Sequence, residues 1–179
     1  KIPEDQHHRI FYVEDMSTYV NYLFPEKKYN LPPNDARVLV QVRDRQNNIV
    51  GVQGRTLGDS RIRYITCGKE NTPLIFGLEV VDFNQMVYVL EGPFDSLFLP
   101  NSLATMGSDL SRVVKLLPGL KSYVLIFDNE PRNPEIVRLM EGAINREMPV
   151  CIFPKTIKSK DINDMILSGL TKEDIIQLI

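Results

Sequence analysis

The strongest architectural signal in the chain is the sequence VYVLEGPFDSLFLPNSLATMGS at residues 87–108. It opens with a short segment that is apolar throughout, passes through a predicted helix and enters a second apolar segment. Strands that are buried on both faces are continuously apolar in this way, and the order strand, helix, strand is typical of a parallel sheet. The sequence therefore predicts an α/β fold around this segment.

The alternation of strand and helix continues from residue 86 towards the C-terminus. Two amphipathic helices are predicted, one at 110–117 and one that begins after the N-cap Asn133. A last helix is predicted to open with a capping box formed by Thr171 and Asp174. The predicted strands are MVYVLE, LATM, YVLIFD and VCIF, which begin at Met86, Leu103, Tyr123 and Val150.

The first part of the chain is predicted to be a small mixed α/β subdomain. A helix ends near Pro25, and RVLVQVR at 37–43 alternates as a half-buried strand does. Asn47 and Asn48 turn this strand into an antiparallel hairpin, and IRYIT at 62–66 is a third strand. The expected domains are a mixed α/β subdomain at 1–84, a core with the parallel sheet at 85–155 and a C-terminal helical segment at 156–179.

Composition sets the class of protein. The 179 residues are 43% hydrophobic and 25% charged, which is globular and excludes a disordered chain. The longest apolar runs are far shorter than the ~20 residues of a membrane span, so we expect a soluble, cytoplasmic protein without a membrane partner. With only Cys67 and Cys151, a reducing compartment is expected. The start at Lys1 and the lack of a signal peptide favour a fragment of a larger protein.

Acidic residues follow the predicted parallel strands. Glu91 and Asp95 come after the first strand, Asp128 and Glu130 after the third, and Asp161 after the fourth. Ligands bind beyond the carboxyl ends of such strands, and a hard divalent cation would offset the repulsion among gathered carboxylates. Each acid taken alone could instead be a surface charge or complement a helix dipole. The joint pattern favours a Mg²⁺ site for phosphoryl or nucleotidyl transfer.

These motifs resemble a known family. VYVLEGPFDSLFLPNSLATMGS is similar to the first motif of Toprim modules and YVLIFDNEPRN to the second. NNIVGVQGRTLGDSRIRYIT and KENTPLIFGL resemble the segments that precede Toprim in bacterial-type DNA primases, and DNEPRNPEIV and KDINDMI resemble T4-type bacteriophage primases. The resemblance runs from about Arg37 to Met165, and it implies a Toprim-type parallel sheet flanked by helices.

The resemblance also implies roles for the acids. Glu91 matches the Toprim glutamate proposed as general base or metal ligand near the primer 3′ hydroxyl. Asp128 and Glu130 match the metal-binding acids, with Asp161 as a further ligand, and the implied cofactor is Mg²⁺ or Mn²⁺. The family triplet is usually Asp-x-Asp with an internal glycine, whereas this chain has Asp128, Asn129 and Glu130. The carboxylate of Glu130 therefore reaches one methylene further.

Other positions match substrate-binding residues of the family. Arg55, Arg63 and Lys69 match basic positions that touch template or nucleotide, and a solvated hairpin is the alternative interpretation. Gly107 and Ser108 match a small pair that lets backbone amides approach the site, and a plain turn with a helix cap explains them equally well. Asp95 completes the set of residues assigned to substrate binding.

The function implied is that of a DNA primase catalytic core, which makes short RNA primers on single-stranded DNA from ribonucleoside triphosphates, with a replicative helicase as partner. The alternatives are a Toprim nuclease or topoisomerase fragment, and a DNA-binding scaffold without chemistry. Bacterial-type primases also carry a zinc-binding module. Its four soft ligands cannot be assembled from Cys67, Cys151, His7 and His8, so no zinc is expected in this chain.

Overall fold

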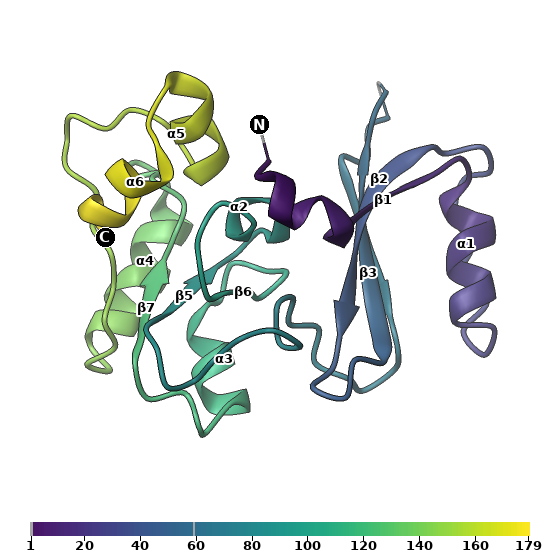
Figure 1. The fold of residues 1–179 in the computed structure, drawn as a ribbon, viewed down its shortest axis with the longest axis horizontal. Coiled ribbons are helices and arrows are strands. Elements are labelled where there is room, and N and C mark those ends of the chain that lie inside the picture. The colour runs from purple at the N-terminus through teal and green to yellow at the C-terminus, as the bar shows by residue number, and fades with distance from the viewer. Residues whose placement is uncertain (1, 59) are drawn as a thin grey trace. The chain divides into compact units, whose positions relative to one another are not determined.

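The computed structural model describes residues 2–58 and 60–179 (Figure 1). By its internal contacts the chain forms two compact units, Glu4–Leu74 and Ile75–Ile179, and Ile2 and Pro3 group with the second. The contacts thus divide the chain between Leu74 and Ile75, and the predicted domain boundaries after residues 84 and 155 stay predictions. No helix in the described part of the chain has the length and apolar character needed to cross a membrane.

The C-terminal unit is built on a three-stranded parallel sheet with the order β6-β5-β7. Helices follow the strands along the chain, as the apolar segments predicted, and Figure 1 shows this order in the colours of the ribbon. The elements are β5 (Val87–Leu90), α2 (Pro93–Ser96), β6 (Ser102–Ala104), α3 (Ser111–Leu116), β7 (Tyr123–Ile126), α4 (Pro134–Ile144), α5 (Ile162–Ser168) and α6 (Lys172–Leu178).

Successive residues of the central strand enter two different cores. Val87 and Val89 pack into a cluster that includes residues of α3 and α4. Leu90 packs into a second cluster, to which α5 contributes Met165 and α6 contributes Ile175. Because side chains alternate across a strand, the two clusters cover opposite faces of the sheet. This explains why the strand is apolar at every position rather than at every second one.

One predicted strand does not form. VCIF at residues 150–153 contributes a single parallel bridge, between Leu125 and Val150, and no regular strand. The backbone N–H of Leu125 donates to Pro149 O, and that of Cys151 donates to Leu125 O, both at 2.9 Å. Pro149 has no N–H with which to extend the ladder towards the start of the segment. The apolar run therefore lies beside β7, but its assignment as a strand was wrong.

The predicted helix starts are confirmed where capping was the signal. The side chain of Asn133 accepts a hydrogen bond from Glu135 N at 3.1 Å, with Pro134 as the first residue of α4. Thr171 and Asp174 form the reciprocal capping box of α6. Each cap satisfies backbone N–H groups that would otherwise lack a partner at a helix N-terminus.

The N-terminal unit is a four-stranded antiparallel sheet with the order β1-β2-β3-β4. A core formed by α1 and the sheet buries Met16, Val20, Leu39, Val52 and Ile65, among others. The sequence predicted the three later strands and the helix but not β1, whose four residues are too short to show a pattern. The elements are η1 (Glu4–Arg9), β1 (Ile10–Val13), α1 (Met16–Leu23), β2 (Arg37–Arg43), β3 (Ile49–Thr56) and β4 (Tyr64–Gly68).

A charged side chain lies inside this unit. Arg37, at the start of β2, is fully buried and pairs with Asp35 at 2.8 Å. Its guanidinium also donates to the backbone carbonyls of Gly54, Ile62 and Arg63 at 3.1, 2.9 and 3.3 Å. These bonds satisfy the buried charge and fix the loop before β4. A Cβ at Gly54 would lie 3.0 Å from Cδ of Arg37, so the glycine leaves room for the stem of this side chain.

Candidate active site

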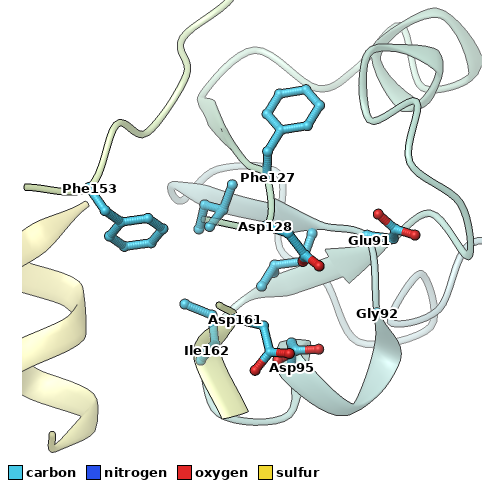
Figure 2. A pocket seen from close by; sticks show the side chains of 10 residues that line it. Glu91, Gly92, Asp95, Phe127, Asp128, Phe153, Asp161 and Ile162 are labelled. Atoms are coloured by element: carbon cyan, nitrogen blue, oxygen red, sulfur yellow. The ribbon is translucent and has the colours of Figure 1, made fainter. Parts of the chain in front are cut away.

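Four carboxylates line one small cavity in the C-terminal unit. Glu91 directly follows β5, Asp128 lies two residues beyond β7, Asp95 belongs to α2, and Asp161 is the N-cap of α5. Figure 2 shows the carboxyl groups of Asp95 and Asp161 beside each other, with Asp128 and Glu91 around the same space. The cavity volume of about 10 Å³ is near the smallest that takes up one water molecule. The acids gather at the carboxyl edge of the sheet, where the sequence placed them.

Two of these acids also hold the start of α5. Asp161 Oδ1 accepts a hydrogen bond from Asp164 N at 2.7 Å, the usual bond of an N-cap. Asp95 Oδ1 reaches across from α2 and accepts from Asn163 N at 2.9 Å. The chain therefore brings the third acidic segment to the sheet edge through backbone N–H groups, which explains how residues 68 positions apart come into contact.

The middle residue of the acidic triplet anchors the neighbouring loop. Asn129 N donates to Lys160 O at 2.6 Å, and its side-chain amide donates to Ser159 O at 3.0 Å and to Ile157 O at 3.2 Å. Three hydrogen bonds from one residue thus hold the backbone of 157–160 beside Asp128 and Glu130. A glycine at this position could make only the first of them.

The anchored loop places an ammonium group between two acids. Lys160 Nζ lies 3.5 Å from Asp128 Oδ2 and 3.5 Å from Glu130 Oε1. The other carboxylate oxygen of Glu130 accepts from the Asn133 side chain at 3.1 Å. The Lys160 side chain is 51% exposed, whereas those of Asp128 and Glu130 are 25% and 31% exposed. Lys160 therefore neutralises part of the acidic edge from its solvent side.

Burial and like charge act together on the acids of the cavity. Burial raises the pKa of the Glu91 carboxyl, and the charge of Asp128 raises it further. Burial also raises the pKa of Asp128, although Lys160 opposes that shift. The pKa of Asp95 rises to about 7, because burial outweighs the hydrogen bond from Asn163 that lowers it. Such shifts are typical of sites where several acids share little water.

The charge of the neighbouring acids acts on Lys160 in the opposite sense. Burial lowers the pKa of its ammonium, but the carboxylates of Asp128 and Glu130 raise it by more, so the pKa lies above its ordinary value. Lys160 is therefore a cation over the whole pH range in which the acids ionise.

The donor chemistry of the site suits a hard divalent ion. Glu91, Asp128, Glu130 and Asp161 offer carboxylate oxygens only, which are the ligands that Mg²⁺ and Mn²⁺ prefer. Among residues 2–58 and 60–179, no three Asp, Glu, His or Cys side chains converge on a common point at ligand distance. The residue types fit the ion, and the ammonium of Lys160 lies against two of the four carboxylates that would bind it.

The remaining predicted residues lie elsewhere. Gly107 and Ser108 follow β6 and do not line the cavity, and a Cβ at Gly107 would meet no atom within 4 Å. Arg55, Arg63 and Lys69 belong to the N-terminal unit. Their roles in substrate binding stay predictions.

The two arginines share one aromatic ring. The guanidinium carbons of Arg55 and Arg63 lie 5.8 and 5.7 Å from the ring centroid of Tyr64, within cation–π range. Arg55 is also the cross-strand partner of Tyr64. Two guanidinium groups are thereby held around an aromatic side chain that is 41% exposed.

Sequence reasoning missed three residues that shape these sites. They are Lys160 and Asn129 at the acidic edge and Arg37 in the N-terminal unit. The position of Lys160 directly before Asp161 was a signal that it lies near the acids. Nothing in the local sequence distinguishes Arg37 from an exposed arginine, because its partners are backbone carbonyls.

Comparison with known proteins identifies relatives of this chain. It is 32% identical over 180 residues to the DNA primase of Enterobacteria phage T4, a match that covers 98% of this chain and 52% of that protein. The chain thus spans about half the length of this relative. No family model matches the sequence.

Solved structures show the same fold. The E. coli primase catalytic core matches with a TM-score of 0.71 and 16% identity, over 99% of this chain and 68% of that one. The primase fragment of the bacteriophage T7 primase-helicase protein matches with a TM-score of 0.62 and 17% identity, over 94% and 74%. The chain is thus similar in sequence to the phage T4 DNA primase and shares the fold of solved primase catalytic cores.

Proposed function

We propose that this chain is the catalytic core of a DNA primase, which joins ribonucleotides into short RNA primers on a single-stranded DNA template. The observation that carries the proposal is the cluster of Glu91, Asp95, Asp128 and Asp161 around one cavity at the carboxyl edge of the parallel sheet. The sequence relationship to the T4 primase supports it independently.

In the proposed reaction, the 3′-hydroxyl oxygen of the growing primer attacks the α-phosphorus of a ribonucleoside triphosphate. A phosphodiester bond forms, and the bond to the leaving pyrophosphate breaks. Glu91 is the residue that we assign to accept the hydroxyl proton, since burial and Asp128 raise its pKa and make it a stronger base than an exposed glutamate. The carboxylates of Asp128, Glu130 and Asp161 would hold Mg²⁺ or Mn²⁺. When bound, the ion would neutralise negative charge on the phosphates.

The template is proposed to contact the N-terminal unit. Arg55 and Arg63 present guanidinium groups, and both groups lie within cation–π range of the Tyr64 ring on the hairpin of β3 and β4. Arginine binds phosphate through two donors, and aromatic rings stack on unpaired bases, so the group has the chemistry of a single-strand contact. Lys69, Gly107 and Ser108 are proposed as further substrate contacts, and a replicative helicase is the proposed partner of the longer protein.

The test is primer extension, because it measures nucleotide addition without requiring initiation. The chain is incubated with a DNA template, an annealed RNA primer, ribonucleoside triphosphates and Mg²⁺, and the labelled RNA is resolved by length. We expect extension that depends on template, stops with EDTA and is lost in Asp128→Asn. Lys115→Ala is the control, because it removes a positive charge at the end of α3, away from the cavity. Cleavage of labelled DNA without any extension would instead support a Toprim nuclease.

A further inference from the structure

Lys160 is a basic residue at the acidic edge of the sheet. Its ammonium lies 3.5 Å from Asp128 Oδ2 and 3.5 Å from Glu130 Oε1, so one cation bridges two carboxylates. The proposed function uses these carboxylates as ligands of a divalent ion. A carboxylate oxygen that faces an ammonium is not available to a metal in the same geometry. The two cations therefore compete for the same oxygens.

We propose that Lys160 is a built-in counter-cation, which holds Asp128 and Glu130 in the metal-free protein and is displaced when a divalent ion binds them. The inference rests on the proposed function, because it takes these acids as metal ligands. It adds that the metal affinity of the site is set partly by a residue that is not a ligand.

The anchoring of the loop makes such an exchange simple. Asn129 binds the carbonyls of Ile157, Ser159 and Lys160, so the backbone of this loop is fixed to the triplet without help from the ammonium. The Lys160 side chain is half exposed, and its long flexible stem can turn the ammonium towards solvent. Displacement therefore needs only side-chain rotation and leaves the acids in place.

The electrostatic balance gives the exchange a direction. Without an added cation, one cavity is surrounded by the carboxylates of Glu91, Asp95, Asp128 and Asp161. The repulsion among these like charges opposes folding. Lys160 offsets part of that repulsion with a single charge. A divalent ion carries twice the charge and binds oxygen directly, so it replaces the ammonium once its concentration is sufficient.

The test measures ion binding rather than catalysis. Mn²⁺ is titrated into wild type and Lys160→Met by calorimetry, at fixed ionic strength and without nucleotide. Methionine keeps the length of the stem and removes the charge. Since exposed ion pairs contribute up to about 1 kcal/mol, we expect Lys160→Met to bind Mn²⁺ about fivefold more tightly. Lys160→Arg, which keeps the charge and can fork across both acids, is expected to bind Mn²⁺ no more tightly than wild type.

A matched control lies two residues away. Lys158 carries the same charge on the same loop, but its ammonium donates to Lys155 O at 2.6 Å. Lys158→Met should leave the Mn²⁺ affinity within twofold of wild type. Thermal melting gives a second readout: Lys160→Met should melt at a lower temperature than wild type in EDTA, and its melting temperature should rise by more when Mn²⁺ is added.

The outcomes separate the inference from the proposed function. If wild type binds Mn²⁺ and Lys160→Met binds it equally or more weakly, Lys160 is not a competing counter-cation and the inference is wrong, while the metal site stands. If neither protein binds Mn²⁺, the proposed metal function fails and the inference fails with it. A fivefold gain that Lys158→Met shares would assign the effect to net charge and would also overturn the inference.

Discussion

Asp95 offers a measurable link between the site and the stability of the fold. Its carboxyl has a pKa of about 7 against an ordinary value of 3.8, because burial raises it and the charges of Asp161 and Asp128 add to the effect. The folded protein therefore holds this proton more tightly than the unfolded chain does. The contribution of Asp95 to stability is greatest below about pH 4, falls as the pH rises towards 7 and stays low above it.

The size of the effect follows from the shift. One pKa unit corresponds to about 1.4 kcal/mol, so a group raised from 3.8 to about 7 destabilises the fold by about 4 kcal/mol when it is ionised in both states. Because the carboxyl is partly exposed, solvent screens some of this, and we expect about 2 kcal/mol. Asp95→Asn removes the charge and keeps the oxygen that accepts from Asn163 N. It should raise the free energy of unfolding by about that amount at pH 8 in EDTA.

The assay is urea unfolding followed by circular dichroism at pH 4 and pH 8, with EDTA and constant ionic strength. Wild type should lose stability between the two pH values by about 2 kcal/mol more than Asp95→Asn does. Asp109→Asn is the matched control, because Asp109 lies outside the cavity and its Oδ1 also accepts a hydrogen bond, from Ser111 Oγ at 2.6 Å. Equal stability of Asp95→Asn and wild type at pH 8 would refute the reasoning that this carboxylate is held in the folded state at a cost.

Four further substitutions test other parts of the structure. Asp128→Asn should abolish divalent-ion binding without lowering the melting temperature, and Mn²⁺ calorimetry with normal affinity would contradict the assigned metal role. Arg55→Ala and Arg63→Ala should each weaken binding to single-stranded DNA of any sequence and reduce the slope of log affinity against log salt by about 0.7, whereas unchanged slopes in both would leave a solvated hairpin. Arg37→Met should destabilise the protein by about 3 kcal/mol in urea unfolding, because it leaves Asp35 and three main-chain carbonyls without their donor, and a loss below about 1 kcal/mol would show that water replaces the guanidinium.

The fold could be predicted where the residues of a segment are enough to explain the structure of that segment. The strand at 87–90 is apolar at every position because each face of the sheet has its own core. The start of α4 could be predicted because Asn133 and Pro134 satisfy that helix end by themselves. The segment at 150–153 is as apolar in sequence as the true strands, but it forms a single bridge to β7, and the preceding Pro149 lacks the N–H that would extend the ladder.

The candidate site could be predicted as far as it depends on topology. Parallel strands end at a common edge, so acids that follow them, such as Glu91 and Asp128, had to lie near one another. The roles of Lys160 and Asn129 could not be predicted from topology. They depend on contacts between two loops that lie about thirty positions apart in the sequence. The local sequence also does not show whether the hairpin that carries Arg55 and Arg63 acts together with the acids. The function of this hairpin stays a prediction.

The buried Arg37 has a consequence for how the hairpin of the N-terminal unit can change. Its three carbonyl partners, at Gly54, Ile62 and Arg63, are main-chain atoms that every amino acid supplies. Substitution of the side chains at 61–63 therefore keeps the hydrogen bonds from Arg37 that hold the loop. The side chains of this loop can therefore be substituted one at a time, in evolution or by protein engineering, to make new contacts. The rest of the unit needs no compensating substitution.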